Sequence, residues 1–477
     1  MKVSEYLRYD AVGLAELVAQ RDVSPSELLD AALARLDEVN PTLNAVVRTF
    51  EPQARSAIDD GLPPGPFSGV PYLLKDVTTQ MAGEITTNGS RLFANARAAD
   101  DSALVAAYKR AGFVIFGKTN SPEFGLVGLT EPDLWGPTLN PWDLDRTCGG
   151  SSGGAASAVA AGIVPAAQAS DGGGSIRIPA SCCGLFGFKP SRGRVSMAPQ
   201  GEGWGGLTTL HAVTHSVRDS AAILDASSQP VLGDPYHLAP PQTPFLDEVK
   251  RDPGKLRIAM LDYNLNDTQQ DPQCTAAVRE TAKLCETLGH TVEQAKLPAE
   301  LKGLLDTAMT IIGATVAFNL QREADRRGRA IAEDEIEPLS RIVWERGKAV
   351  TGVQYAQAVQ AMHSAGRIAA QWMAPYDVVL LSTMGTLPIP VGLLKNGVAD
   401  IDQLSAKHAN YAPNTHVFNA TGQPAMSLPL AMSKEGLPIG IQFAARTGDE
   451  AVLFRLAGQL ETARPWADRR PSAIPFP

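Results

Sequence analysis

Blocks of apolar and polar residues along the chain predict helices and strands that follow one another. Near the N-terminus, Ser24-Pro25-Ser26-Glu27 is a capping box with proline at the first helical position. Leu29, Leu33 and Leu36 then recur at helical spacing and share one face. We therefore predict an amphipathic helix, which Asn40-Pro41 is expected to end.

Short apolar runs in the second half of the chain predict buried strands. Such runs occupy residues 256–261, 378–382 and 440–444. A helical pattern begins near Gln273 and ends near Gly289. Strands that alternate with helices predict an α/β fold whose sheet is covered on both faces by helices.

Composition describes a chain that can bury a large core. Its 477 residues are 44% hydrophobic, and the length allows one large domain or two to three average ones. No linker-like segment or internal repeat interrupts the sequence. The net charge of −9 argues against partners that are nucleic acids or anionic membranes.

The sequence also predicts location and the state of the cysteines. The first ten residues carry charges and lack a signal-peptide core, and no apolar run is expected to span a bilayer. We therefore expect a cytoplasmic protein. The five cysteines lack the regular spacing of a disulfide framework or a metal site, and the adjacent Cys182 and Cys183 are interpreted as buried structural thiols.

Serines at two sites surrounded by glycines are the clearest chemical signal. They lie in Gly149-Gly150-Ser151-Ser152-Gly153-Gly154 and in Asp171-Gly172-Gly173-Gly174-Ser175. A backbone without side chains turns sharply and directs several N–H groups at one place, as an oxyanion hole requires. Two such sites in close succession suggest acyl-transfer chemistry.

A nucleophilic serine needs a base, and the first 210 residues contain no histidine. Lys75 lies in an apolar context, Val70-Pro71-Tyr72-Leu73-Leu74-Lys75-Asp76. A lysine acts as a base when it is neutral, and burial lowers its pKa from about 10.4. Asp76 would oppose that shift if its carboxylate pointed inward.

Each of these residues also has an ordinary structural interpretation. Lys75 fits a surface lysine at the end of a strand, and glycine-serine runs are typical of flexible loops. Asp171 fits a turn cap paired with Arg177. Against the flexible-loop interpretation, residues 155–162 have the pattern of a buried helix.

Two other motifs are judged to be coincidental. Residues 112–119 fit the phosphate-loop pattern, but 113–116 have strand character and Asn120-Ser121-Pro122 follows at once. Residues 149–153 fit the nucleophile elbow, with Asp377 and His416 as later partners. That elbow needs a strand directly before it, whereas residues 140–145 have turn character.

In several motifs the chain resembles the amidase signature hydrolases, which use a Ser–cis-Ser–Lys triad. The resemblance covers nearly the whole chain, and its motifs occur in the family's order. Besides the two serine motifs, they are Gly69 to Asp76, Gly117-Lys118-Thr119-Asn120, Asn140-Pro141-Trp142, Gly187-Phe188-Lys189-Pro190, Gly422-Gln423-Pro424-Ala425 and Pro438-Ile439-Gly440.

The resemblance implies a role for each matching residue. Ser175 would be the nucleophile, and Ser151, on a cis peptide bond after Gly150, would pass its proton to Lys75. The N–H groups of Gly172, Gly173, Gly174 and Ser175 would form the oxyanion hole. Ser152, Asp171 and Arg177 would support the loop. The resemblance implies no metal and no organic cofactor.

For the architecture, the resemblance implies one domain over residues 1–477, built on a large mixed sheet. Residues 1–60 would form N-terminal helices, and residues 240–405, which depart most from the motifs, would shape the substrate pocket. Tyr72, Trp135, Cys148 and Trp204 are the candidate substrate-binding residues. A homodimer is expected from the family alone.

The substrate implied by the resemblance is a small or medium linear or cyclic amide. Among family branches, the chain is most similar to 6-aminohexanoate cyclic dimer hydrolases, which act on nylon oligomers. That similarity includes Pro465-Trp466 and Arg469-Arg470-Pro471 near the C-terminus. Aryl acylamides and carbamates remain alternatives, as do the amidase subunit of a glutamyl-tRNA(Gln) amidotransferase and a catalytically silent binding protein.

Overall fold

The computed structural model of the chain describes residues 1–395 and 401–476 and, from 401 to 405, the backbone alone. Residues 396–400, which belong to the predicted variable region 240–405, and residue 477 lie outside the described part. Within that part, an 11-stranded sheet has the order β1-β3-β2-β6-β8-β7-β12-β13-β11-β9-β10, and β4 and β5 form a separate hairpin. The strands are β1 (Val46–Thr49), β2 (Pro71–Lys75), β3 (Val114–Thr119), β4 (Leu139–Asn140), β5 (Asp143–Thr147), β6 (Ala166–Asp171), β7 (Phe186–Lys189), β8 (Thr209–Thr214), β9 (Arg257–Leu261), β10 (Thr291–Gln294), β11 (Val378–Ser382), β12 (Ala425–Met432) and β13 (Pro438–Ala445).

The sheet is mixed. Strands β3, β2 and β6 are parallel to one another, as are β11, β9 and β10, and antiparallel pairs join the strands between these two groups. Strands β2, β6 and β11 are buried along their whole length, as is typical of parallel strands covered on both faces.

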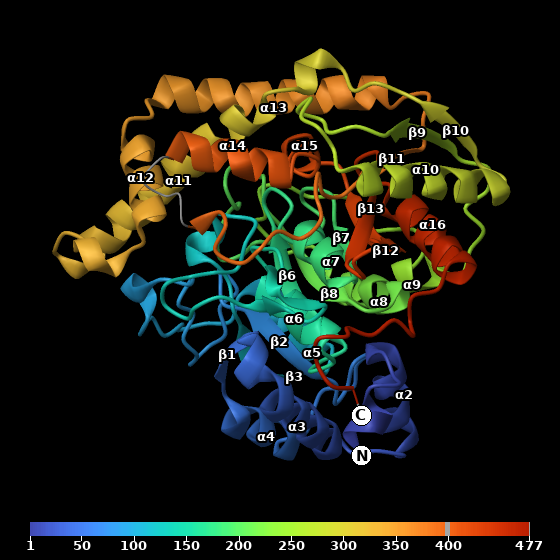
Figure 1. Cartoon of the computed structure of the whole chain (residues 1–477). Coiled ribbons are helices and arrows are strands. Elements are labelled where there is room, and N and C mark those ends of the chain that lie inside the picture. Colours follow the sequence, from blue (N-terminus) through green and yellow to red (C-terminus); the bar gives the residue numbers. More distant parts are fainter. Residues whose placement is uncertain (396–400, 477) are drawn as a thin grey trace.

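Helices cover the sheet in layers (Figure 1). Helices α6 and α7 pack beside each other on the central strands, and α8, α9 and α16 pack together as another group, in which α8 contacts β7 and β8 and α16 contacts β12 and β13. The α-helices are α1 (Val3–Tyr6), α2 (Ala11–Gln20), α3 (Pro25–Leu43), α4 (Glu51–Asp59), α5 (Ala103–Arg110), α6 (Gly153–Ala160), α7 (Arg177–Cys183), α8 (Val217–Ser227), α9 (Phe245–Glu248), α10 (Pro272–Thr287), α11 (Leu304–Arg327), α12 (Pro338–Lys348), α13 (Gly352–Trp372), α14 (Ile401–Tyr411), α15 (Val417–Ala420) and α16 (Glu450–Ala463). The predicted α/β fold, a large mixed sheet covered on both faces, is confirmed.

Most of the predicted elements are present within a few residues of their expected bounds. Strand β11 coincides with the apolar run at 378–382, and α10 with the helical pattern near Gln273. The capping box at Ser24 is formed by both of its hydrogen bonds. The expected stop at Asn40-Pro41 is wrong, because α3 continues to Leu43 and ends at Asn44, whose N–H donates to the Asn40 carbonyl.

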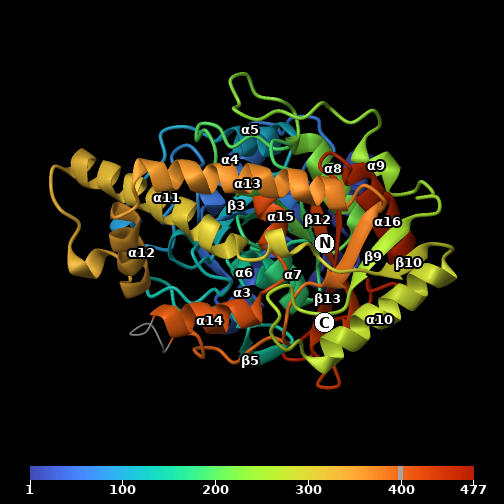
Figure 2. The same ribbon diagram turned by 90° about the horizontal axis from the view of Figure 1, so that it is seen from above.

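A second hydrophobic core lies between the sheet and helices α11, α12 and α13. These helices lie at the opposite end of the molecule from α2, α3 and α4 (Figure 1), and Figure 2 shows α11 and α13 side by side from above. By length and composition alone, the segment Ala299–Arg327 is long and apolar enough to cross a membrane, which departs from the sequence expectation. A helix in a protein core can meet the same criteria of length and composition, and in this structure α11 packs against α12 and α13.

Candidate active site

Lys75 lies at the carboxyl end of β2, buried within the protein. Its Nζ is 2.7 Å from Ser151 Oγ and 2.9 Å from Ser170 Oγ, and its backbone N–H donates to Gln168 at 2.9 Å. The parallel pairing of β2 with β6 brings Ser170 to this place, since the two strands end at the same edge of the sheet. Lys75 therefore contacts one serine of the first glycine motif directly.

Burial lowers the pKa of Lys75 to about 7, although the nearby Asp171 carboxylate raises it. A pKa near neutrality makes the free amine of Lys75 accessible at neutral pH. The concern that Asp76 would oppose this shift has a structural answer. Its carboxylate accepts from the Thr87 N–H at 2.9 Å and also from the Thr87 hydroxyl, and its charge acts on Lys118, where it opposes the lowering of the pKa by burial.

Ser151 follows a cis peptide bond from Gly150, as the resemblance implied. A Cβ on Gly150 would lie 2.4 Å from the Leu129 carbonyl oxygen, so only glycine fits there. Helix α6 begins directly after this turn, and all of its residues are buried. The run is therefore the packed start of a core helix, which excludes the flexible-loop interpretation.

Ser175 lies in the turn between β6 and α7, and it is half-buried in a mostly buried segment. Its carbonyl oxygen accepts from the Ser152 N–H at 3.3 Å, which ties the two glycine motifs together. The Ser152 hydroxyl in turn donates to the Ser170 carbonyl at 3.2 Å. Lys75, Ser151, Ser152 and Ser175 are thus gathered at the carboxyl ends of neighbouring strands.

A buried ion pair holds the Ser175 turn in place. Arg177 donates to Asp171 through Nε and Nη2, both at 2.9 Å, and it also donates to Gln442 and Asn419, each at 2.7 Å. Burial alone would raise the pKa of Asp171, but the Arg177 charge and hydrogen bonds hold it below its usual range. Because both charges are fully buried, each depends on the other.

The four expected oxyanion donors are not equivalent. The Gly174 N–H donates to Asp171 Oδ1 at 2.7 Å, so it is already used within the turn. In the described part of the chain, the N–H groups of Gly172, Gly173 and Ser175 donate to no other group. Gly174 instead has a positional role, since φ is 135° and a Cβ there would lie 2.4 Å from Thr415 Oγ1.

The four candidate substrate-binding residues occupy different environments. Tyr72 is fully buried and stacks on Phe113 at 4.2 Å between ring centroids, inside the core. Cys148 is also fully buried, and its Sγ donates to the Thr138 carbonyl at 3.3 Å. Trp135 is half-buried and donates to Thr87 Oγ1 at 3.3 Å, beside Asp76.

Trp204 is the candidate that lies against the serine loop. A Cβ on Gly172 would be 2.6 Å from Cζ3 of the Trp204 ring, so the ring covers the loop backbone. A Cβ on Gly205 would lie 2.8 Å from Cγ2 of Ile311 and 3.3 Å from the Tyr355 hydroxyl. Helices α11 and α13 therefore meet the Trp204 loop, which puts side chains of region 240–405 next to Gly205.

Two further buried lysines are potential rivals for the role of base. Burial lowers the pKa of Lys118 to about 8 and that of Lys189 to about 7. Lys118 donates to Thr86 Oγ1 at 3.0 Å, and Lys189 to the Pro190 carbonyl at 2.8 Å. Of the three, Lys75 alone contacts a serine of either glycine motif in the described residues.

Several site residues were not found from the sequence. Ser170 directly precedes Asp171, and this position beside the glycine motif was the signal that could have identified it. Thr415 donates to the Gly173 carbonyl at 2.6 Å, and Asn419 donates to the Asp171 carboxylate at 2.8 Å. Both lie more than 200 residues beyond the loop in a segment without a recognisable motif.

The strand before Cys148 and the contacts of Asp377 and Ser151 disagree with the nucleophile-elbow alternative. A short strand, β5, does precede Cys148, so the expected turn character of residues 140–145 is only partly correct. That strand belongs to the separate hairpin with β4, however. Asp377 accepts from the Arg257 N–H at 2.8 Å, which occupies it at the start of β11. Ser151 contacts Lys75 instead.

Comparisons with known proteins agree on one family. The family model described as Amidase matches residues 27–454. A 6-aminohexanoate-cyclic-dimer hydrolase from Pseudomonas sp. strain NK87 is 38% identical over 98% of this chain and 97% of the relative. A solved structure of 6-aminohexanoate cyclic dimer hydrolase complexed with substrate has a TM-score of 0.94 at 38% identity and covers 98% of this chain and 100% of that one. A bacterial aryl acylamidase structure has a TM-score of 0.87 at 26% identity and covers 96% of this chain and 97% of that one.

Proposed function

The chain belongs to the amidase signature family and is a hydrolase of carbon–nitrogen bonds other than peptide bonds, and we propose that it acts through an acyl-enzyme on Ser175. The observation that carries this proposal is the 2.7 Å contact between Lys75 Nζ and Ser151 Oγ, beside the half-buried Ser175. A neutral lysine next to a bridging serine provides a route by which the nucleophile loses its proton.

In the first half-reaction, Ser175 Oγ attacks the amide carbon. Its proton passes to Ser151 Oγ while the Ser151 proton passes to the Lys75 amine, which becomes an ammonium. The same path then returns a proton to the amide nitrogen. The carbon–nitrogen bond breaks, the amine leaves, and the acyl group remains on Ser175 as an ester.

Developing negative charge on the carbonyl oxygen needs fixed donors. The N–H groups of Gly172, Gly173 and Ser175 are free for this purpose in the described part of the chain, and that of Gly174 is engaged by Asp171. We therefore assign the oxyanion hole to the N–H groups of Gly172, Gly173 and Ser175. The Asp171–Arg177 pair positions them by fixing the turn.

In the second half-reaction, water takes the place of the amine. Neutral Lys75 accepts a proton from that water through Ser151 as its oxygen attacks the ester carbon. The tetrahedral intermediate then collapses, the acid product leaves, and Ser175 regains its proton. Every proton that the enzyme takes up in the cycle is returned, so water is the one co-reactant.

For the substrate, we propose 6-aminohexanoate cyclic dimer or a related medium-sized amide. The support is the likeness to the hydrolase of that name, at 38% identity over almost the full length of both chains. Trp204 supplies aromatic surface beside Gly172, and Ile311 and Tyr355 add to it beside the neighbouring Gly205, as a carbon-rich amide requires. Aryl acylamides are the second candidate, because the aryl acylamidase structure also covers nearly the whole chain.

Turnover of a substrate panel tests this proposal. The purified full chain is incubated with 6-aminohexanoate cyclic dimer, a linear 6-aminohexanoate dimer, an acyl anilide and glutamine, and released amines are quantified. Wild-type protein and Ser56→Ala, a control for an exposed surface serine, should cleave the cyclic dimer. Ser175→Ala should not. Faster cleavage of the anilide than of the cyclic dimer would make an aryl acylamide the proposed substrate. Turnover by Ser175→Ala equal to that of the wild type would overturn the mechanism.

The setting of the enzyme is also a proposal. We propose a cytoplasmic homodimer that needs no nucleic acid and no membrane. Its support is the net charge of −9, which repels polyanions and anionic surfaces, together with the family resemblance. Light scattering of the purified protein tests the dimer, with the mass of one chain as the contrary result.

A further inference from the structure

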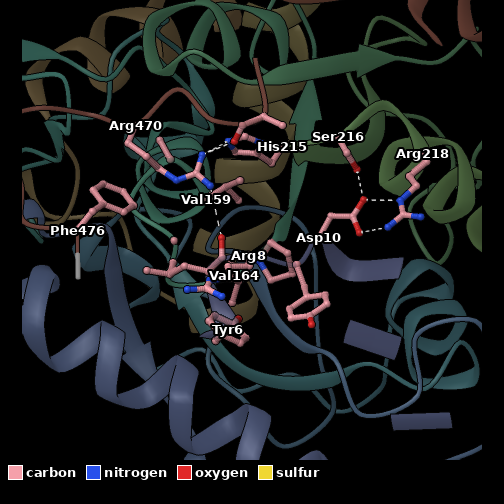
Figure 3. A pocket seen from close by; sticks show the side chains of 16 residues that line it. Tyr6, Arg8, Asp10, Val159, Val164, His215, Ser216, Arg218, Arg470 and Phe476 are labelled. Atoms are coloured by element: carbon pink, nitrogen blue, oxygen red, sulfur yellow. Dashed lines mark hydrogen bonds and ion pairs between the residues drawn. The ribbon is translucent and has the colours of Figure 1, made fainter. Parts of the chain in front are cut away.

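A cavity of about 280 Å³ lies far from Ser175, where the start and the end of the described chain meet. Its wall includes Tyr6 and Arg8 from the N-terminal segment, His215 after β8, and Arg470 and Phe476 near the C-terminal end (Figure 3). The volume is just below the range of about 300–1,000 Å³ that is typical of small-molecule sites. The space therefore suits a small organic molecule.

The wall carries positive charge that no carboxylate neutralises at contact distance. Arg470 donates only to neutral acceptors, including the Leu7 carbonyl at 3.4 Å and the Arg469 carbonyl at 3.0 Å. The Arg8 guanidinium has no hydrogen-bond or ion-pair partner in the described residues. Burial lowers the pKa of Arg470, and the exposed Asp468 opposes that shift from a distance, but in that part of the chain no ion pair joins the two side chains.

The third arginine at the cavity is different, because it is already paired. Arg218 donates to both oxygens of Asp10, each at 2.6 Å, and Ser216 Oγ donates to the same carboxylate at 2.7 Å (Figure 3). The one carboxylate in the wall is thus satisfied. Arg8 and Arg470 remain as a local excess of cations on a protein whose net charge is −9.

His215 contributes a neutral polar group beside Arg470. Burial, assisted by the Arg470 charge, lowers the pKa of His215 to about 4, so the imidazole is neutral at pH 7. Its Nε2 lies 3.5 Å from Arg470 Nη1. The imidazole therefore helps to fix the guanidinium without cancelling its charge.

The rest of the wall is apolar. Val159 and Val164 come from the end of α6 and the approach to β6, and Phe476 lies beneath the Arg470 guanidinium at 5.9 Å from the ring centroid. A ligand that suits the whole cavity has an anionic head for the two arginines and a short aliphatic body for these side chains. Inorganic anions satisfy only the first of these conditions.

We propose that this cavity is a second binding site, which takes a short aliphatic carboxylate between Arg8 and Arg470. The ligand's carboxylate accepts hydrogen bonds from the two guanidinium groups, which are the preferred partners of that anion. Its hydrocarbon chain lies on Val159, Val164 and Phe476. Binding here does not depend on Ser175 or on the proposed hydrolytic mechanism.

Helix α6 and strand β6 each extend from the serine cluster to the cavity, so the length of either element separates the two places. Helix α6 begins after Ser152 and has its last residue, Ala160, in the cavity wall. Eight helical residues rise about 12 Å. Strand β6 likewise begins after Pro165, which lines the cavity, and ends at Asp171. The proposed site is therefore distinct from the active site.

Calorimetric titration of the full-length protein with hexanoate, 6-aminohexanoate and inorganic phosphate tests the proposal. Arg8→Gln and Arg470→Gln each remove one guanidinium. Arg110→Gln is the matched control, since Arg110 is exposed at the end of α5 and has no side-chain partner in the described residues. Arg8→Gln should fold normally, because the Arg8 guanidinium makes no hydrogen bond or ion pair with any other part of the described structure. Loss of binding in this variant is therefore not explained by misfolding.

Hexanoate should bind the wild type and Arg110→Gln with the same Kd, and at least about tenfold more weakly to Arg8→Gln and Arg470→Gln. Equal binding to all four proteins would locate the acid elsewhere, including at Ser175, and overturn the proposal. Absence of hexanoate binding to the folded wild type would do the same. Tighter binding of phosphate than of hexanoate would overturn the assignment to a carboxylate.

Discussion

If Lys75 is the base, kcat/KM follows the fraction of this lysine that is a free amine. Burial lowers the pKa of Lys75 to about 7, so activity should rise with pH and level off above neutrality. An ordinary lysine with a pKa of about 10.4 is neutral in only about one molecule in 2,500 at pH 7. Burial therefore increases the fraction of Lys75 that is a free amine about 1,000-fold at pH 7.

Replacing Lys75 by methionine keeps the length of the side chain and removes the amine. We expect kcat/KM to fall about 10²- to 10⁴-fold, the usual contribution of a general base, and the rising limb near pH 7 to disappear. The assay is kcat/KM across the pH range with an amide that does not itself titrate. Circular dichroism of the variant establishes that it is folded.

Lys189 provides the matched control, because burial also lowers its pKa to about 7 and it contacts neither glycine motif. Folded Lys189→Met should keep the rising limb that Lys75→Met loses. If Lys189→Met loses the rise of kcat/KM near pH 7 and Lys75→Met keeps it, the assignment of Lys75 as the base is refuted. A wild-type limb centred near pH 10 would also refute it.

Three further predictions follow from the same contacts. Lys75→Met should raise Tm more at pH 7 than at pH 10, because a lysine whose folded pKa is depressed destabilises the fold below its unfolded pKa of about 10.4; an equal Tm change at both pH values would contradict this. Ser151→Ala should lower kcat about 100-fold or more by removing the group that contacts Lys75, with no loss of Tm, and wild-type kcat would exclude the relay. Arg177→Met should lower the free energy of unfolding in urea by about 3–5 kcal/mol, because it leaves Asp171 buried without its partner, whereas a change near zero would show that the pair is dispensable.

Local patterns predicted those parts of the molecule that depend on neighbours in sequence. Strand β11 is an apolar run, and the start of α3 is a capping box, so each is specified within a few residues. The end of α3 was mispredicted because the helix continues through Pro41 to the Asn44 cap, although a proline inside a helix is unfavourable. Motif order located Lys75 and Ser151, and the structure brings them to 2.7 Å.

Contacts between distant segments could not be predicted in the same way. Thr415 and Asn419 reach the Ser175 loop because β12, which follows them in the chain, lies beside β7 in the sheet, and local sequence patterns do not determine strand order. The Gly174 N–H was expected to face the substrate, but the Asp171 side chain reaches it first. Tyr72 was expected in the pocket, yet alternation along β2 turns it to the face opposite Lys75, against Phe113.

The central claim is that Ser175 is an activated nucleophile, and intact-protein mass spectrometry after treatment with a fluorophosphonate tests it most directly. Wild-type protein should gain the mass of one phosphonyl group at neutral pH, and Ser175→Ala should gain none. Labelling at pH 5 should be slower, since the buried Lys75 is then protonated. Equal labelling of Ser175→Ala, or an unlabelled wild type that still hydrolyses amides, would contradict the account.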